Sequence, residues 1–186
     1  MTTAVEKVLL TAEELLRVPN DGRPKELVRG RVVYMNVPKP RHGQICSKVD
    51  RILGNFADER NLGHVVSSDS GARTERGPDT VRGADVAFYS YSRVPPGPFP
   101  GEDYLPVVPE LVFDVRSPTD RWSVILAKVA EYLEAGVTIV CVLDQMTERC
   151  YVYRNEEPVQ VLAAEQELTI PDVLPEFRVL VQRFFK

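Results

Sequence analysis

The segment from Glu110 to Asp144 constrains the fold of this 186-residue chain more than any other part. It opens with the apolar run LVFDVR and continues into a predicted helix from about Asp120 to Ala135, which Gly136 ends. It closes with VTIVCVLD, a nearly continuous apolar run typical of a central strand buried on both faces. A strand, a helix and a second strand in this order predict a right-handed crossover with the two strands parallel.

The other segments fit the same plan. A short helix is predicted at TAEELLRV, where Thr11 and Glu14 have the spacing of a capping box, and a longer helix between Pro40 and Gly63. Strands are predicted at KELVRGRVVYM (two, around Arg29 and Gly30), HVVSSDSGART, ADVAFYS, ERCYVYR and PVQVLAA, and a short terminal helix at LPEFRVLVQRFFK. This order predicts a single α/β or α+β domain over residues 1–186, with a mixed β-sheet flanked by helices.

A proline-rich segment runs from Tyr91 to Pro109 and interrupts the regular elements. A loop of this length inside a small domain is usually a functional lid, an arm for a partner, or disordered. The sequence leaves these alternatives open.

Composition excludes several classes of protein. The net charge of −4 argues against strong non-specific binding to nucleic acid, and the arginine groups at Arg73, Arg76 and Arg82 and at Arg116 and Arg121 are interpreted as a solvated face. No apolar stretch reaches the length of a membrane span. Because no signal-peptide pattern is found at the N-terminus, we expect a cytoplasmic protein.

Cysteine and histidine usage argues against a structural zinc site. The three cysteines, Cys46, Cys141 and Cys150, are widely spaced in apolar or mixed surroundings, which favours buried free thiols. The two histidines, His42 and His64, form no pair at a spacing interpreted as metal-binding.

Two aspartates lie within apolar strands and are the best functional clue. Asp114 is flanked by Phe113 and Val115, and Asp85 lies in GADVAFYS. A charge buried without a partner is costly, so such a residue is usually paired, protonated or bound to a metal. If the two strands are neighbours, both carboxylates can face one cleft and suit Mg²⁺, which would promote hydrolysis of a phosphodiester.

The chain resembles the Uma-type family of restriction-endonuclease-like proteins, which have the PD-(D/E)XK nuclease fold. The resemblance covers almost the whole chain and rests on the order and spacing of KELVRGRVV, PRHGQICSKV, GADVAFYS, PELVFDVRSPTDR and KVAEYLEAGVTIVCVLD. It implies an endonuclease that cleaves DNA with Mg²⁺, or alternatively Mn²⁺, as cofactor. We also expect a homodimer or a higher homo-oligomer, since cutting both strands needs two sites.

The resemblance also implies roles for particular residues. Asp85 and Asp114 match the two acids of the nuclease core, although the family commonly has Glu at the second position. The lysine that normally follows two residues later is replaced by Arg116, and Lys128 on the next helix takes its place, while Glu26 matches an N-terminal acid of such sites.

Physical chemistry adds further roles for these residues. A buried Lys128 with a lowered pKa could orient or deprotonate a water molecule. The backbone carbonyl of Val115 could also ligate the ion, and Arg116 could hold a phosphate or pair with Asp114. His42 is a candidate phosphate contact, although a surface or capping histidine is the more usual case.

Two alternatives stay open at this point. Asp85, Asp114, Arg116 and Lys128 could form a buried ion-pair network without metal. The chain could then be a non-catalytic binding or interaction module on a nuclease-like scaffold, assembling through the proline-rich segment.

Overall fold

The computed structural model describes residues 9–19, 21–99, 101 and 103–186. The N-terminal residues 1–8 and Pro100 of the proline-rich segment lie outside this part. The helices are α1 (Ala12–Arg17), α2 (Pro40–Arg60), α3 (Trp122–Glu134) and α4 (Gln182–Phe185). The strands are β1 (Lys25–Val28), β2 (Arg31–Tyr34), β3 (Gly63–Glu75), β4 (Thr80–Ser90), β5 (Leu111–Arg116), β6 (Ile139–Asp144), β7 (Arg149–Tyr153), β8 (Gln160–Leu162), β9 (Glu167–Thr169) and β10 (Arg178–Leu180).

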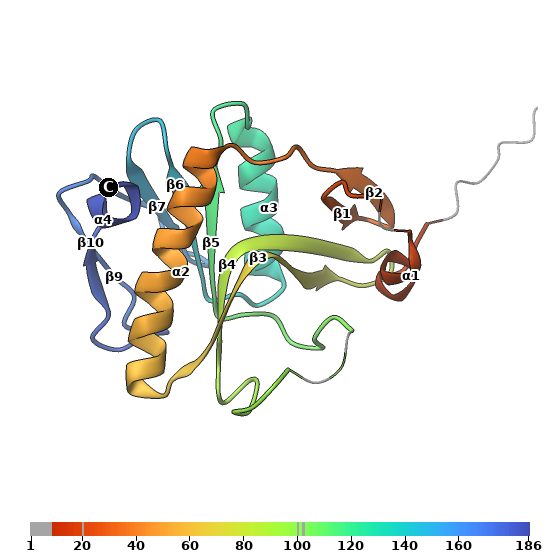
Figure 1. Cartoon of the computed structure of the whole chain (residues 1–186), viewed down its shortest axis with the longest axis horizontal. Helices are drawn as coiled ribbons and strands as arrows, with labels where there is room; N and C mark the ends of the chain where they lie inside the picture. The colour runs from red at the N-terminus through yellow and green to blue at the C-terminus, as the bar shows by residue number, and fades with distance from the viewer. Residues whose placement is uncertain (1–8, 20, 100, 102) are drawn as a thin grey trace, which may run out of the picture.

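One mixed sheet forms the centre of the molecule, with the strand order β2-β1-β4-β5-β6-β7-β8 and with β3 paired to β4. The β5–β6 pair is parallel, as predicted, and the other pairs of this sheet are antiparallel. Figure 1 shows α2 and α3 on either side of this sheet. The predicted mixed sheet flanked by helices is confirmed.

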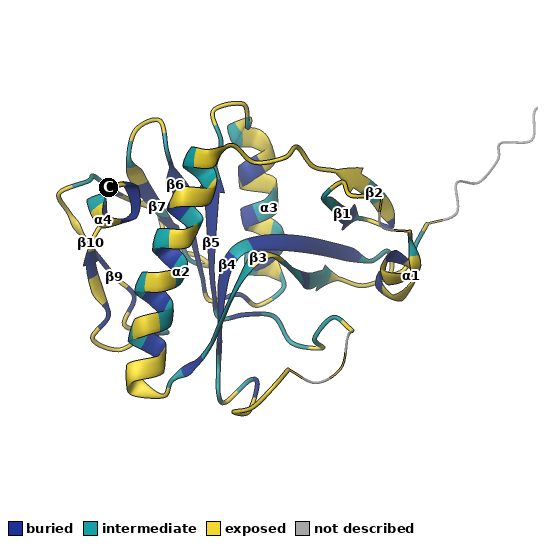
Figure 2. Ribbon diagram, viewed as in Figure 1, coloured by how far each residue is buried: buried dark blue, intermediate teal, exposed yellow. Residues whose placement is uncertain are grey.

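Alternation along β5 divides the core into two layers. Leu111, Phe113 and Val115 pack in the cluster that includes α2, whereas Val112 packs in the cluster that includes α3. Every residue of β6 is buried, so this strand is central in the sheet, as its apolar run predicts (Figure 2).

The C-terminal segment differs from the predicted terminal helix. Only Gln182–Phe185 are helical, and the preceding residues form a two-stranded sheet of β9 and β10. Leu168, Phe177 and Val179 are buried in the α2-side cluster. Leu168 lies on β9 and Val179 on β10, so burial along two short extended strands explains why the apolar residues here are not part of one helix.

The described part of the proline-rich segment is a packed loop. Val94 is buried in the α3-side cluster, and Leu105, Val107 and Val108 pack against it. Arg93 holds the two ends of the loop together, because its guanidinium donates to the Val108 carbonyl and pairs with Glu110 at 3.1 Å. Within the described residues, the reading of this segment as disordered is therefore wrong.

None of the helices in the described part of the chain is long and apolar enough to cross a membrane.

Candidate functional site

The register of β4 and β5 brings the two predicted acids together. Val86 of β4 lies opposite Phe113 of β5 in an antiparallel pair, so the next step of the register places Asp85 opposite Asp114. The backbone N–H of Val115 donates to Asp85 Oδ2 at 2.6 Å. The strands are neighbours, as the sequence argument required, and this hydrogen bond fixes the Asp85 carboxylate beside the end of β5.

Lys128 of α3 reaches the same point from the helical layer. Its ammonium donates to Asp114 Oδ1 at 3.1 Å and to the carbonyl of Gly83 at 2.7 Å. The Asp114 side chain is 5% exposed and that of Lys128 15%, so solvent screens their attraction little. The predicted convergence of Lys128 on Asp114 is present.

Glu26 of β1 connects this pair to a second one. Its Oε1 lies 3.6 Å from Lys128 Nζ and accepts the N–H of Gly83, and its Oε2 accepts Arg82 at 2.7 Å. Arg82 in turn pairs with Glu131 of α3 at 2.5 Å. The result is a buried chain of alternating charges that ties β1, β4 and α3 together around Lys128.

The surroundings shift the pKa values of the central pair in a way that revises one expectation. Burial raises the pKa of Asp114 to about 6, and although Lys128 opposes this shift, Asp85 adds to it. Burial alone would lower the pKa of Lys128, but Asp114, Tyr132 and Glu26 outweigh it and raise that pKa well above its ordinary value. Lys128 is therefore held as a cation, and the expected lowered pKa of a general base is wrong.

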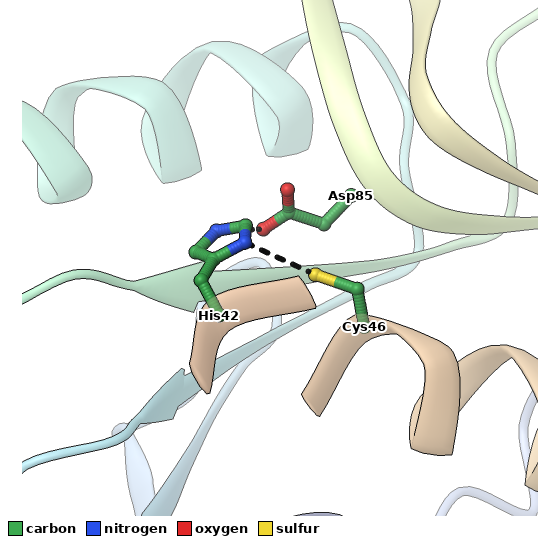
Figure 3. A group of neighbouring side chains, drawn as sticks. All are labelled: His42, Cys46 and Asp85. Atoms are coloured by element: carbon green, nitrogen blue, oxygen red, sulfur yellow. Dashed lines mark hydrogen bonds and ion pairs between the residues drawn. The ribbon is translucent and has the colours of Figure 1, made fainter. Parts of the chain in front are cut away.

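Figure 3 shows His42, Cys46 and Asp85 side by side, with the first two on adjacent turns of α2. His42 Nε2 lies 3.4 Å from Asp85 Oδ2, and Cys46 Sγ lies 3.4 Å from His42 Nδ1. One ligand atom from each residue can be chosen so that all three lie within 4.8 Å of one another. The statement that no Cys or His pair has metal spacing is thus wrong, because a separation of four residues puts both side chains on one face of a helix.

His42 is neither an ordinary surface residue nor a helix cap, since its side chain is only 13% exposed and faces Asp85. Burial lowers its pKa, but the hydrogen bond and charge of Asp85, with Asp69 and Asp120 adding to them, raise the pKa overall. Near neutral pH a larger share of His42 therefore carries a positive charge, which suits a contact with an anion.

Asp69 is a site residue that the sequence analysis missed. It lies in β3 where the pairing with β4 is irregular, and both Ser68 and Asp69 have positive φ. Burial and the nearby Asp85 raise the pKa of its carboxyl, whereas Lys128 and His42 lower it, which places Asp69 in the same electrostatic cluster. In the sequence it stands in the polar run SSDSG, and no pattern distinguishes it there from a turn residue.

Arg116 does not join the pair of acids. It binds Asp144 at 3.0 Å and the carbonyl of Asp120 at 3.0 Å, and its guanidinium lies over the Trp122 ring. The alternative in which Arg116 pairs with Asp114 is therefore wrong, and the buried network has Glu26 in its place.

Other arginines that the sequence placed on a solvated face are also paired. Arg73 binds Glu13, and Arg82 binds Glu26 and Glu131. The side chains of Arg73 and Arg82 are 8% and 10% exposed. The prediction that these two arginines belong to a solvated face is therefore wrong.

The arrangement suits a hard divalent cation. Asp114 Oδ2 is buried and has no hydrogen-bond partner among the described residues, although Lys128 Nζ lies 3.1 Å away. Carboxylate oxygens are the ligands that Mg²⁺ and Mn²⁺ prefer, and Asp85 on the neighbouring strand supplies a second carboxylate. The residue types of Asp85 and Asp114 thus suit such an ion, although an ion at Asp114 would have to compete with the ammonium of Lys128.

The comparisons with known proteins agree with this fold. A family model named Uma2 and described as "Putative restriction endonuclease" matches residues 12–182. The crystal structure of a putative nuclease belonging to DUF820 from Anabaena variabilis superposes with a TM-score of 0.80. That structure has 17% sequence identity, over 95% of this chain and 97% of the other, so it shows a shared nuclease-like fold. Among curated proteins, none matches the chain. Since the family model covers nearly the whole chain, this protein belongs to the Uma2 family of putative restriction endonucleases.

Proposed function

We propose that this chain is a metal-dependent endonuclease that hydrolyses DNA phosphodiester bonds, with Mg²⁺ as the physiological ion and Mn²⁺ as an alternative. The observation that supports the proposal is that Asp85 and Asp114 lie on neighbouring strands, each next to the paired residues Val86 and Phe113, with the ammonium of Lys128 on Asp114. Membership of the Uma2 family supports a nuclease.

In this proposal Asp85, Asp114 and the backbone carbonyl of Val115 hold the ion. When bound, the ion would polarise the phosphate and lower the pKa of a coordinated water. Hydrolysis would add the oxygen of this water to phosphorus and break the bond from phosphorus to one sugar oxygen, which leaves with a proton.

The side chains of the protein supply position and charge. Lys128 is a fixed cation beside Asp114, so it would orient the attacking water or stabilise negative charge that develops on the phosphate. Glu26 would position Lys128, since its carboxylate lies 3.6 Å from the ammonium. His42 and Arg116 are the proposed phosphate contacts, and the raised pKa of His42 favours that role.

Cleavage of supercoiled plasmid tests the activity. The wild type should nick or linearise the plasmid with Mg²⁺ or Mn²⁺ and not with EDTA, and Asp85→Asn and Asp114→Asn should reduce the rate at least about 100-fold. Arg149→Gln is a matched control, because Arg149 is exposed on β7. Wild-type protein that leaves the plasmid intact with both ions would refute the proposal.

The second candidate is a non-catalytic binding module. The observation that favours it is that Lys128 already bridges Asp114 and Glu26, so each of these carboxylates has a cationic neighbour without an ion. Calorimetry separates the two functions, because a binding module should take up no Mn²⁺ at Asp85 and Asp114. Deleting Tyr91–Pro109 is a poor test of this function, since the deletion would remove the buried Val94 from the core.

We further propose a single domain, a cytoplasmic location and a homodimer, since cleavage of both strands requires two sites. Sedimentation velocity at working concentration should give a species of about 42 kDa, twice the 20.9 kDa of one chain. A monomer at that concentration would refute the proposed homodimer.

A further inference from the structure

A second polar surface lies away from the candidate metal site. It is a groove of about 610 Å³ between the later turns of α2 and the C-terminal elements β10 and α4. Six of the residues that line it are cationic: Lys48, Arg51, Arg60, Arg178, Arg183 and Lys186. Only one lining residue, Glu59, is acidic. The chain as a whole has a net charge of −4, so positive charge is concentrated in this groove against the overall balance.

Most of these cations have no carboxylate partner. Arg60 pairs with the exposed Glu59 at 3.3 Å. In the described part of the chain, Lys48, Arg51, Arg178 and Arg183 form no ion pair within 4.0 Å. This distinguishes them from Arg73, Arg82 and Arg116, each of which pairs with a carboxylate of the chain. The groove charges are available to an external anion.

The groove is separate from the acidic site. His42 and Cys46 direct one face of α2 toward Asp85, whereas Ile52, Asn55 and Glu59 lie on another face that lines the groove. Figure 1 shows β10 and α4 on the flank of α2 opposite α3. A ligand held in the groove would therefore leave the carboxylates of the metal site accessible.

The shape of the groove favours an extended anion over a single phosphate. The cations of α2 run from Lys48 to Arg60, a distance of about 18 Å along a helix axis. Successive phosphates of one DNA strand rise by about 3.4 Å along the duplex, so about five fit within this length. Four of the six cations are arginines, whose planar guanidinium matches phosphate geometry. Ile52, Phe56 and Val179 add an apolar wall that suits sugars or unstacked bases.

We infer that this groove binds the phosphodiester backbone of a nucleic-acid strand, and that it does so independently of hydrolysis at Asp85 and Asp114. The surface would hold a substrate or product strand on the flank of α2 away from the metal site. Electrostatic binding of this kind depends on the neutralised phosphates, so it weakens steeply with salt.

Fluorescence anisotropy in EDTA tests the inference without cleavage. The full chain is titrated into labelled single-stranded and double-stranded oligonucleotides at several salt concentrations. The variant Arg51→Glu/Arg178→Glu/Arg183→Glu removes three groove cations, and Arg17→Glu/Arg31→Glu/Arg149→Glu makes the same charge change at exposed positions outside the groove. Thermal unfolding and circular dichroism check that both variants fold. If the groove variant does not fold, Arg51→Gln/Arg178→Gln replaces it.

The groove variant should lose at least about tenfold in affinity. The logarithm of its association constant should also depend less steeply on the logarithm of the salt concentration: each lost phosphate contact lowers the slope by about 0.9, so three lost contacts lower it by up to about 2.7. The control variant should keep the wild-type slope. Equal losses in both variants would overturn the inference, as would a mononucleotide that competes as well as an oligonucleotide. A groove variant that keeps wild-type affinity but dissociates in sedimentation would assign the groove to contact between copies of the chain, and would also overturn it.

This inference and the proposed function fail separately. Loss of nucleic-acid binding only in the groove variant, with no metal-dependent cleavage by the wild type, would support the groove and refute the nuclease. Cleavage that depends on Asp114, together with unchanged binding in the groove variant, would support the nuclease and refute the groove.

Discussion

At the scale of single residues, Asp114 connects the sequence to the proposed chemistry. The sequence marked it as a charge in an apolar strand, and the structure gives it a cationic neighbour in Lys128 and an acidic one in Asp85. Side-chain type and position along the chain indicated that Asp85 and Asp114 could face one cleft, whereas Lys128 was predicted only from the resemblance to the family. They were not sufficient to predict the sign of the Lys128 pKa shift, because that sign depends on three-dimensional distances to several carboxylates.

The raised pKa of Asp114 predicts a pH effect on the stability of the metal-free protein. The folded protein holds a proton up to about pH 6, whereas the unfolded chain releases it near pH 3.8. Between these values the folded state binds more protons, so this group lowers the free energy of unfolding as the pH rises. Urea denaturation should show that the wild type loses stability relative to Asp114→Asn between about pH 4 and pH 6.5. Parallel profiles for the two proteins would contradict the raised pKa.

The Lys128–Asp114 pair should also be strongly coupled. Lys128→Met leaves Asp114 and Glu26 as buried carboxylates without their shared cation, which should cost about 3–5 kcal/mol in free energy of unfolding. The double variant Asp114→Asn/Lys128→Met should cost less than the sum of the two single changes. Chemical denaturation of all four proteins gives the coupling energy, and additive losses would show that the pair is independent.

At the scale of elements, most helices and strands could be predicted from periodicity and turn residues, and the errors have identifiable causes. The strands β9 and β10 are only three residues each, too short for an alternating pattern to stand out beside the apolar residues of the tail. Asp69 was missed because it lies where the pairing of β3 with β4 is irregular, and an irregularity of this kind has no reliable signature in one sequence.

The junction of α2 and β3 gives a prediction about packing. A Cβ atom added at Gly63 would overlap the carbonyl oxygen of Tyr89 and the ring of Phe88. Gly63→Ala should therefore lower the free energy of unfolding by about 1–3 kcal/mol, because backbone and a buried ring must move.

Gly54→Ala is the matched control, since a Cβ atom there meets nothing within 4 Å inside α2. It should raise the free energy of unfolding by about 0.5–1 kcal/mol through helix propensity. Thermal unfolding compares the two variants. A Gly63→Ala protein as stable as the wild type would show that this junction is looser than described.

At the scale of the whole molecule, the two charged regions differ in how far the sequence could indicate them. The acidic site was predicted from motifs whose order along the chain resembles that of the family. The basic groove combines residues of α2 with residues of β10 and α4 that are more than 100 positions away, so no local run of charge indicates it. The arginine groups that stand out locally proved to contain internal ion pairs.

The central claim is that Asp85 and Asp114 together hold a divalent ion. Crystals grown with Mn²⁺ and measured for anomalous scattering test it directly. The account predicts a single strong peak at about 2.1–2.3 Å from one oxygen of each carboxylate, and no peak at that position in crystals of Asp114→Asn. The absence of any peak there in the wild type, with Lys128 still bound to Asp114 at a saturating concentration of Mn²⁺, would contradict the account.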